Sequence, residues 1–458
     1  MSSKFSKFLG YVRGRRIAVA GMGVSNTPLI RLLLDAGAFV TVCDKKEYDA
    51  LDAALRDEFK ARGAKFQTGE DYLEGLDHEL IFKTPGMRPD MPELNAARER
   101  GSVVTSEMDV FMHVCPAHII GVTGSDGKTT TTTVIYELLK AAGKTCYIGG
   151  NIGNPLLDRA GDMREDDWAV LELSSFQLMT MTRSPEISVI TNLAPNHLDV
   201  HTSMQEYTDA KRNIYLYRPE GGRVVLNADN DVTRALSDEV GEDCVLFSRR
   251  EVLPDGVYCR DGEIIRAGRK ILDCAGIKIP GVHNVENYMA AIAAVGDIVP
   301  DEVIRRVAAE FAGVVHRMEL VREKDGVKYY NDSIASSPSR TIAGLRALGT
   351  KVILIAGGYD KHIPFDVLGP EAVKYVKRLI LVGATTPKIR AAVEAADGYS
   401  PESLPIHEVK TMDEAVMTAC RYAVRGDIVT LSPACASFDL YVNFAARGEH
   451  FKELVNAL

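Results

Sequence analysis

The sequence has no CxxC pair, no apolar run of membrane length and no excess of basic residues. Its eight cysteines are scattered, so zinc-ribbon spacing is absent and free thiols in a reducing compartment are the simplest interpretation. No apolar run is long enough to span a bilayer. The first ten residues, MSSKFSKFLG, lack the apolar core of a signal peptide. We therefore expect a cytoplasmic protein that does not insert into membranes.

The charge balance is acidic, with a formal net charge of −9 over 458 residues. A general nucleic-acid binder is therefore excluded, because there is no basic excess to neutralise phosphates. Small anionic ligands remain possible, since they need only a few local cations. We expect a monomer whose partners are small molecules and not nucleic acids.

Buried apolar runs alternate with amphipathic stretches along the whole chain. Residues 15–46 show an apolar run, a glycine-rich turn, an amphipathic stretch and a second apolar run, which is a β-α-β pattern. The same alternation of apolar runs and amphipathic stretches begins again near residue 113 and after residue 315. The sequence thus predicts an α/β protein with mostly parallel sheets and three domains, residues 1–112, 113–315 and 316–458. The first and third domains are expected to be Rossmann-like.

The segment GVTGSDGKTTTTT, residues 121–133, has the order of a phosphate-binding site: a buried strand, a glycine loop, a lysine and a helix. Gly124 and Gly127 would let the backbone approach oxygen atoms. Lys128 offers a charge to the β- and γ-phosphates, and the Thr129 hydroxyl suits magnesium. The first glycine of the strict P-loop pattern is missing, so the loop is shorter by one residue. We interpret the threonine run as a polar, ligand-facing first turn of a helix in a P-loop-type ATPase domain.

Other polar residues follow predicted strands or open a predicted helix. Glu172 lies inside an apolar run, where a carboxylate is costly unless it binds a cation, so it either shares magnesium with Thr129 or forms a buried salt bridge. His197 belongs to the segment NHLDVH, which is either a metal site or a solvated loop with capping roles. Asn284 and Asn287 suit an adenine edge, or they cap a helix.

Eight motifs occur in the order found in one enzyme family. They are TGSDGKTTT (123–131), LELSSFQL (171–178), NHLDVH (196–201), HNVENYMAA (283–291), HRME (316–319), NDSIASSP (331–338), GGYDK (357–361) and LSPACASFDLYVNFAARGEHF (431–451). On these motifs the chain resembles the Mur ligase family over essentially its whole length. The ATP loop is also similar to that of folylpolyglutamate synthetase. ELSSFQL and SPACASFD favour the glutamate-adding branch of the family.

The resemblance implies an ATP-dependent amide ligase of peptidoglycan precursor synthesis. It implies ATP and magnesium as cofactors, with two magnesium sites, and UDP-N-acetylmuramoyl-L-alanine and D-glutamate as substrates. The first domain would bind the UDP-sugar, the second ATP and the third the amino acid. An acyl phosphate would be the intermediate, and the third domain would close onto the second.

The resemblance also assigns roles to individual residues. The catalytic set is Lys128, Glu172, His197 and Lys211. The metal set is Thr129, Glu172, His197 and Lys211, the lysine acting as a carbamate formed with carbon dioxide. The ATP-binding set is Gly124, Ser125, Asp126, Gly127, Lys128, Thr129, Thr130, Asn284, Asn287, Arg317 and Asp332. The UDP-sugar set is Ser25, Asp44, Lys45, Asn151 and His197, and the D-glutamate set is Ser336, Lys361, Ser437 and Phe444.

Two residues differ from what the local pattern or the family would lead one to expect. From its local pattern alone, Lys211 looks like any exposed helix lysine, and only the resemblance singles it out. Ile334 occupies the position after Asn-Asp-Ser where many relatives have lysine. One cation that could meet the carboxylates of glutamate or the acyl phosphate is therefore absent.

Four alternatives remain open. A sibling Mur ligase would add a different amino acid, and a folylpolyglutamate synthetase-like ligase would share the ATP loop. A nucleotide-driven switch or motor would hydrolyse ATP or GTP without an amino acid. GMGVSN (21–26) with Asp44 resembles a dinucleotide fingerprint, but Asn26 replaces its third glycine, so a nicotinamide oxidoreductase is a weaker interpretation.

Overall fold

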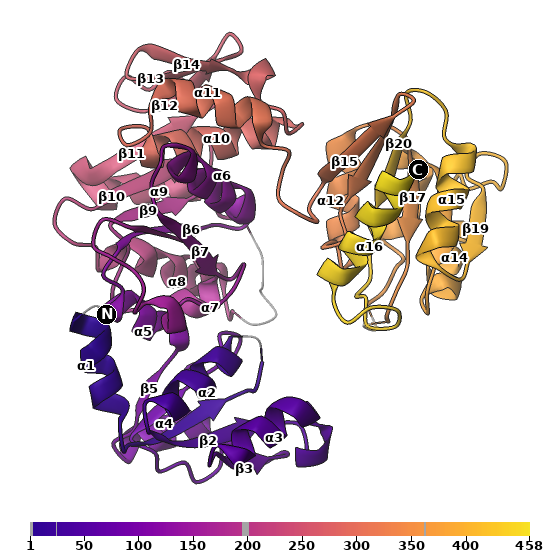
Figure 1. The fold of residues 1–458 in the computed structure, drawn as a ribbon. Helices are drawn as coiled ribbons and strands as arrows, with labels where there is room; N and C mark the ends of the chain where they lie inside the picture. The colour runs from indigo at the N-terminus through magenta and orange to yellow at the C-terminus, as the bar shows by residue number, and fades with distance from the viewer. Residues whose placement is uncertain (1–2, 24, 195–200, 361–362) are drawn as a thin grey trace. The chain divides into compact units, whose positions relative to one another are not determined.

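The structure is a computed structural model in which residues 3–23, 25–194, 201–360 and 363–458 are described. The chain divides into two compact units: residues up to 277 with 283–309, and residues 278–282 with 310–458 (Figure 1). Within the described residues the strands form three sheets, two in the first unit and one in the second. The predicted α/β class with mostly parallel sheets is confirmed. The predicted domain limits near residues 112 and 315 stay predictions.

The first sheet has the strand order β3-β2-β1-β4-β5, and every pairing in it is parallel. Its strands are β1 (Arg16–Ala20), β2 (Phe39–Asp44), β3 (Lys65–Thr68), β4 (Leu80–Phe82) and β5 (Val103–Thr105). Its helices are α1 (Ser3–Val12), α2 (Asn26–Asp35), α3 (Ala53–Ala61), α4 (Pro92–Glu99) and α5 (Glu107–Val114). Alternate residues of β1 pack on opposite faces: Ile17 and Val19 share a core with α1, α2 and α5, whereas Ala18 and Ala20 pack with α4. This is the predicted Rossmann-like arrangement, whose ligand edge lies at the carboxyl ends of the strands.

The second sheet has the order β14-β13-β12-β11-β10-β9-β6-β8-β7. Its strands are β6 (His118–Thr123), β7 (Cys146–Gly150), β8 (Trp168–Glu172), β9 (Ile187–Ile190), β10 (Arg223–Asn227), β11 (Cys244–Ser248), β12 (Val257–Arg260), β13 (Glu263–Arg266) and β14 (Arg269–Asp273). The pairings from β7 to β12 are parallel, and β12, β13 and β14 pair antiparallel. The strands β12, β13 and β14 are therefore an antiparallel extension of this sheet.

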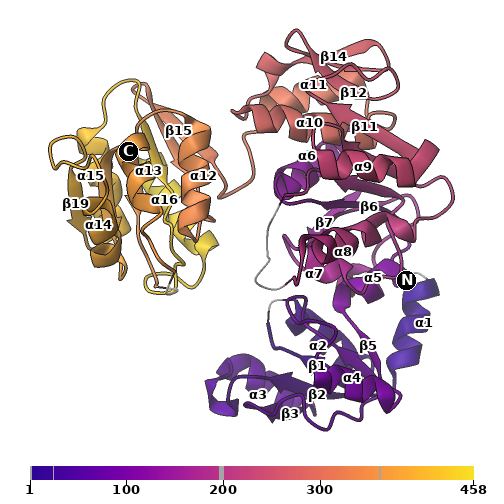
Figure 2. The same cartoon turned by 180° about the vertical axis from the view of Figure 1, so that it is seen from behind.

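Helices lie against both faces of the second sheet (Figures 1 and 2). They are α6 (Lys128–Ala141), α7 (Ser175–Leu178), α8 (Met204–Leu216), α9 (Asp231–Val240), α10 (Val282–Val295) and α11 (Asp301–Glu310). The helix α10 is rich in alanine, and it is buried at every residue from Asn287 to Val295. Short 3₁₀ turns are η1 (Tyr48–Ala50), η2 (Leu157–Arg159), η3 (Gly241–Asp243) and η4 (Cys274–Gly276).

The second unit contains the sheet β15-β16-β20-β17-β18-β19, in which only the β15–β16 pairing is antiparallel within the described residues. Its strands are β15 (Glu319–Lys324), β16 (Val327–Asn331), β17 (Val352–Ala356), β18 (Val376–Val382), β19 (Ile406–Val409) and β20 (Ile428–Leu431). Its helices are α12 (Pro338–Leu348), α13 (Leu368–Tyr375), α14 (Thr386–Glu394), α15 (Met412–Tyr422) and α16 (Phe444–Ala457). The helices α12, α13 and α14 pack on one face, and α15 and α16 pack on the other.

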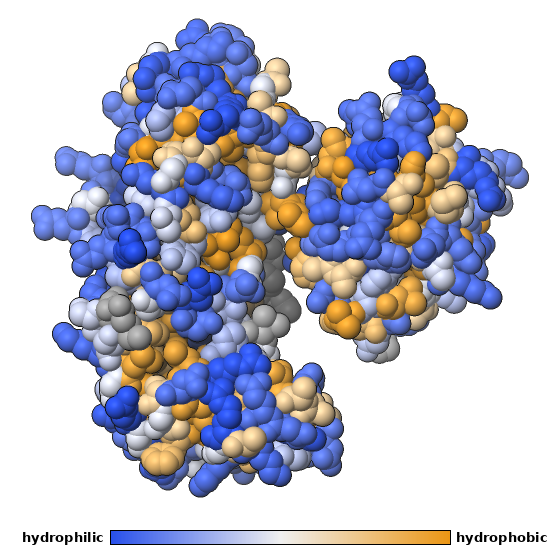
Figure 3. Space-filling view, in the orientation of Figure 1, coloured by the Kyte–Doolittle hydropathy of each residue, from blue (hydrophilic) through white to orange (hydrophobic). Residues whose placement is uncertain are grey.

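The surface of both units is largely hydrophilic, with separate apolar patches (Figure 3). Several exposed apolar side chains of the second unit lie in the segment between β20 and α16 and at its junction with α16, namely Phe438, Leu440, Val442 and Phe444. Among the helices described, none is long and apolar enough to cross a membrane.

Candidate active site

The loop between β6 and α6, residues 124–127, depends on its two glycines. Gly124 has φ +148° and Gly127 has φ +77°, a backbone region that favours glycine. A Cβ on Gly124 would lie 2.0 Å from Thr191 Oγ1, and one on Gly127 would lie 2.4 Å from Asn287 Oδ1. The glycines therefore let the loop pack closely against the end of β9 and against α10.

We expect Gly124→Ala to destabilise the protein and to abolish ATP binding. The new Cβ would displace the Thr191 hydroxyl, which donates to Asp126 O at 2.5 Å and so holds the loop. Gly143→Ala is the matched control, because Gly143 follows the same helix with φ +80° and open space around its Cβ position. The control should lose about 1–2 kcal/mol from backbone strain alone, and Gly124→Ala about 3 kcal/mol or more. Thermal unfolding and ATP titration measure both; equal losses would contradict the close-packing argument.

Backbone amides at the start of the loop already have protein acceptors. Ser125 N donates to Asn192 O, and Asp126 N donates to Asn192 Oδ1, each at 2.9 Å. The first turn of α6, with Thr129 and Thr130, contains the amides that a helix leaves unpaired internally. An anion at this loop would therefore bind chiefly to the backbone amides at the N-terminus of α6.

The threonine run is only in part a ligand-facing turn. Thr132 Oγ1 donates to Lys128 O and Thr133 Oγ1 donates to Thr129 O, each at 2.8 Å. These bonds to the carbonyl four residues earlier satisfy the two hydroxyls within α6. The interpretation of the whole run as ligand-facing is thus wrong for Thr132 and Thr133.

Glu172 is brought beside Thr129, as expected if their two strands were neighbours. The pairing of β6 with β8 places Val122 opposite Glu172. Glu172 is buried; its Oε2 accepts from Thr129 Oγ1 at 2.7 Å and its Oε1 accepts from Asn151 Nδ2 at 2.8 Å. Within the described part of the chain, no cationic side chain lies within ion-pair distance of this carboxylate. The buried salt bridge considered for Glu172 is therefore not formed here.

Lys211 projects from α8 into the interior and is buried, contrary to its exposed appearance in the sequence. Its Nζ donates to Thr123 Oγ1 at 2.9 Å and to Gly124 O at 3.1 Å, and it lies 4.8 Å from the centre of the Tyr207 ring. Burial, with a smaller contribution from the charge of Lys128, holds the pKa of Lys211 well below its usual value. The amine is therefore neutral over a wider pH range than that of an exposed lysine.

Asn284 and Asn287 lie within α10 rather than at its cap, because the helix begins at Val282. Asn287 Nδ2 donates to Asn284 Oδ1 at 3.0 Å, and Asn287 Oδ1 accepts from Thr131 Oγ1 at 3.2 Å. The pair therefore joins α10 to the first turn of α6.

The expected UDP-sugar residues of the first sheet lie at the carboxyl ends of β1 and β2. Asp44 Oδ2 accepts from Met22 N and its Oδ1 accepts from Lys46 N, each at 2.9 Å. Ser25 precedes α2 without a capping bond from its side chain, and Lys45 is exposed. The buried Asn26 donates through Nδ2 to Ala20 O and Gly21 O, so it ties down the glycine-rich turn in place of a third glycine.

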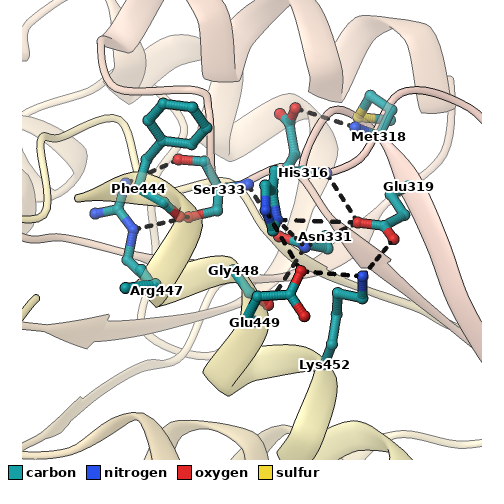
Figure 4. A network of polar contacts seen from close by, with 12 residues as sticks. His316, Met318, Glu319, Asn331, Ser333, Phe444, Arg447, Gly448, Glu449 and Lys452 are labelled. Carbon is teal, nitrogen blue, oxygen red and sulfur yellow. Dashed lines mark hydrogen bonds and ion pairs between the residues drawn. The ribbon is translucent and has the colours of Figure 1, made fainter. Parts of the chain in front are cut away.

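In the second unit, Arg317 is exposed in a loop held by its neighbours. Both His316 (φ +64°) and Met318 (φ +46°) adopt left-handed backbone conformations. Met318 N donates to Asp332 Oδ1 at 3.2 Å, and burial raises the pKa of Asp332 to about 6. Figure 4 shows His316 and Asn331 facing each other in the same network. Asp332 therefore fixes the loop that presents Arg317.

Three of the four expected D-glutamate residues come from two loops and a helix start. Ser336 follows β16, Ser437 follows β20, and Phe444 is the first residue of α16. Ser437 is buried, whereas Phe444 is exposed. His197 and Lys361 lie outside the described residues.

Several residues of the site were missed in the sequence. Thr191 and Asn192 anchor the phosphate loop, and their only signal is that they follow a buried strand. Tyr207 bonds Ser125 Oγ at 3.1 Å and lies beneath Lys211, although it looks like an ordinary core residue. Arg447, which is buried in the second unit, had no signal either.

Two family models match the chain. The Mur ligase middle domain matches residues 122–295, and the Mur ligase, glutamate ligase domain matches residues 316–435. The chain is also 51% identical to UDP-N-acetylmuramoylalanine–D-glutamate ligase of Acetivibrio thermocellus and 49% identical to the ligase of the same name from Clostridium novyi, and both alignments cover the whole of each chain.

A solved structure shares the fold. UDP-N-acetylmuramate-alanine ligase from Thermotoga maritima superimposes with a TM-score of 0.60 over 97% of this chain and 99% of its own, at 17% identity. The similarity extends over both units, including the second sheet with Glu172 on β8 and the helices α6 and α8 that carry Lys128 and Lys211. With relatives about half identical over its full length and with both domain models matched, the chain belongs to the Mur ligase family.

Proposed function

We propose that the chain is an ATP-dependent ligase that joins D-glutamate to UDP-N-acetylmuramoyl-L-alanine in peptidoglycan precursor synthesis. The observation that carries this proposal is the convergence of the glycine loop, Glu172 and Lys211 at the carboxyl ends of β6 and β8. The names of the full-length relatives support the choice of amino acid and acceptor. We further propose a monomer located in the cytoplasm, where ATP and UDP-linked precursors are made.

The reaction has two steps. The alanine carboxylate attacks the γ-phosphorus of ATP, which releases ADP and forms an acyl phosphate. The amine of D-glutamate then attacks the acyl carbon, and the tetrahedral intermediate loses inorganic phosphate to leave the amide. The side chains need to do no covalent work, so alignment and charge neutralisation dominate, as in other phosphoryl transfers. Lys128 is the cation assigned to the β- and γ-phosphates.

The residues around Glu172 suit a magnesium ion. The buried Glu172 carboxylate and the Thr129 hydroxyl are hard oxygen ligands. Among the described residues no cationic side chain lies within ion-pair distance of this carboxylate, and Lys211 interacts with it only from farther away. We assign Thr129 and Glu172 as ligands, together with His197 and a carbamate on Lys211. Magnesium bound there would neutralise phosphate charge during transfer.

The state of Lys211 supports a carbamate. Only a neutral amine attacks carbon dioxide, and burial together with Lys128 favours the neutral form of Lys211. The reaction forms an N–C bond and releases one proton, so the cationic side chain becomes an anionic oxygen ligand.

The remaining assignments are proposals on the same footing. Within the first unit we assign the UDP-sugar to Ser25, Asp44, Lys45 and Asn151. We assign the nucleotide to the loop residues 124–130 with Asn284 and Asn287, and to Arg317 and Asp332 of the second unit. D-Glutamate is assigned to Ser336, Lys361, Ser437 and Phe444. The domain limits proposed are residues 1–112, 113–315 and 316–458.

Phosphate release with a panel of amino acids tests the function. We expect release near background with ATP alone, and turnover only when UDP-N-acetylmuramoyl-L-alanine and D-glutamate are both present. Mass spectrometry should then identify the amide product. A switch or motor would hydrolyse nucleotide without an amino acid, and a sibling ligase would prefer another member of the panel. Either result would contradict the proposal.

A further inference from the structure

Arg447, in the first turn of α16, is a buried cation whose hydrogen bonds go to neutral acceptors. The residue is 3% exposed, and among the described residues no carboxylate lies within ion-pair distance of its guanidinium. Burial lowers the pKa of Arg447 to about 10, which still leaves it charged at neutral pH. The second unit therefore contains a fixed positive charge that forms no ion pair with any side chain in the described part of that unit.

The guanidinium joins two loops at the carboxyl edge of the sheet. Arg447 Nε donates to Ser333 Oγ at 3.0 Å and Nη2 donates to Ser333 O at 2.8 Å. Nη1 donates to Ala436 O at 3.0 Å, and Nη2 also donates to Cys435 O at 3.1 Å. Figure 4 shows Ser333 between Arg447 and Phe444, and Ser333 Oγ donates to Phe444 O at 2.7 Å. One side chain thus connects the loop after β16, the loop after β20 and the start of α16.

These three segments carry Ser336, Ser437 and Phe444, three of the four residues assigned to the amino acid. Ser336 lies three residues after Ser333, Ser437 directly follows Ala436, and Phe444 begins α16. The parallel strands β16 and β20 are neighbours, so both loops leave the same edge of the sheet, where α/β folds bind ligands. Arg447 therefore supports, through its hydrogen bonds, the segments that are expected to contact the incoming amino acid.

An unpaired buried charge is costly, and neutral acceptors offset only part of that cost. Asp439 attracts Arg447 only from beyond ion-pair distance, and its Oδ2 accepts from Ala384 N at 3.0 Å. A hydrophobic side chain could fill the same space without this penalty. An anionic ligand bound at the neighbouring loops would be stabilised by the positive charge of Arg447. This charge matters more here because Ile334, and not a lysine, follows Ser333 in this chain.

We propose that Arg447 is a specificity-determining residue, which positions the two loops and favours an amino acid with two carboxylates over its amide. The inference rests on the proposed function, in which D-glutamate is the incoming amino acid. Arg447 acts on the ligand through these loops and through its charge.

The test compares D-glutamate with D-glutamine, which differs by one carboxylate. In the full-length enzyme, Arg447→Gln should raise the KM for D-glutamate and reduce the preference for D-glutamate over D-glutamine about tenfold, the effect expected for one nearby charge. Arg447→Lys should keep most of that preference, because it keeps the charge. The KM for ATP should change little in both variants. Ser333→Ala, which removes one acceptor of the clamp but no charge, is the matched control and should keep the preference.

Two further variants complete the test. Ile334→Lys added to Arg447→Gln should restore the preference in part. Asp439→Asn keeps an oxygen that can accept from the Ala384 amide but removes a negative charge near Arg447. In the otherwise unchanged enzyme it should raise the preference for D-glutamate over D-glutamine about threefold. If Arg447→Gln does not fold, this variant tests the inference in its place. The inference is overturned if Arg447→Gln keeps the preference for D-glutamate. It is also overturned if Arg447→Lys and Arg447→Gln lose that preference equally, because this is the result expected if Arg447 only holds the loops together. A wild-type enzyme that ligates no D-glutamate would instead overturn the proposed function.

Discussion

Lys128→Ala should abolish ligation while leaving the protein folded. Lys128 is the first residue of α6, and its Nζ donates to Gly124 O at 2.9 Å and to Ser125 O at 2.8 Å, so the side chain lies over the phosphate loop. A compact ammonium group at this position stabilises the negative charge that develops on the phosphate oxygens during phosphoryl transfer. Losing one such group costs about 10³-fold in kcat, the upper end for a single preorganised donor.

Stability should be largely preserved in this variant, because the charge of Lys128 disfavours protonation of the nearby Lys211 amine. Removing Lys128 therefore takes away an unfavourable interaction with the protonated form of Lys211. Lys140→Ala is the matched control: it removes the same charge from the exposed end of the same helix and should retain full activity. Appreciable ligation by Lys128→Ala in a phosphate-release assay would refute the assigned role.

The features predicted from the sequence were those determined by local pattern. The strand, glycine loop and helix around Lys128 could be identified because each has its own signature in a short window. Glu172 could be placed beside Thr129 because a carboxylate in a buried strand is unusual, and parallel neighbours bring their carboxyl ends together.

The features that were missed depend on contacts between distant parts of the chain. Lys211 meets Thr123 and Gly124, which lie more than eighty residues earlier, and nothing in the polar sequence of α8 distinguishes a buried lysine from an exposed one. Thr132 and Thr133 were misjudged because a threonine hydroxyl can bond to its own helix as readily as to a ligand. Arg447 meets Ser333 across 114 residues, and its burial depends on the packing of α16. Such contacts become visible only when the sheet order is known.

Lys211→Ala should inactivate the enzyme, and acetate or formate should restore part of the activity. The truncation leaves a polar cavity beside Thr123 Oγ1 and Gly124 O, where a small carboxylate could place an oxygen near the position that a carbamate would occupy. Lys211→Met is the matched control, because it removes the amine but fills the space. It should be as inactive as the alanine variant and should not respond to acetate.

The carbamate also predicts a dependence on carbon dioxide that a structural lysine would not have. Wild-type enzyme freed of carbon dioxide and bicarbonate should lose activity, recover it when bicarbonate is added, and in native mass spectrometry differ by the mass of one carbon dioxide. Lowering the pH should weaken the modification, because protonation of the Lys211 amine competes with its attack on carbon dioxide. Since burial holds the pKa of Lys211 well below its usual value, that competition sets in at a lower pH than for an exposed lysine. If the alanine and methionine variants respond alike to acetate, Lys211 supports the loop through its contacts with Thr123 and Gly124 and carries no metal-binding group.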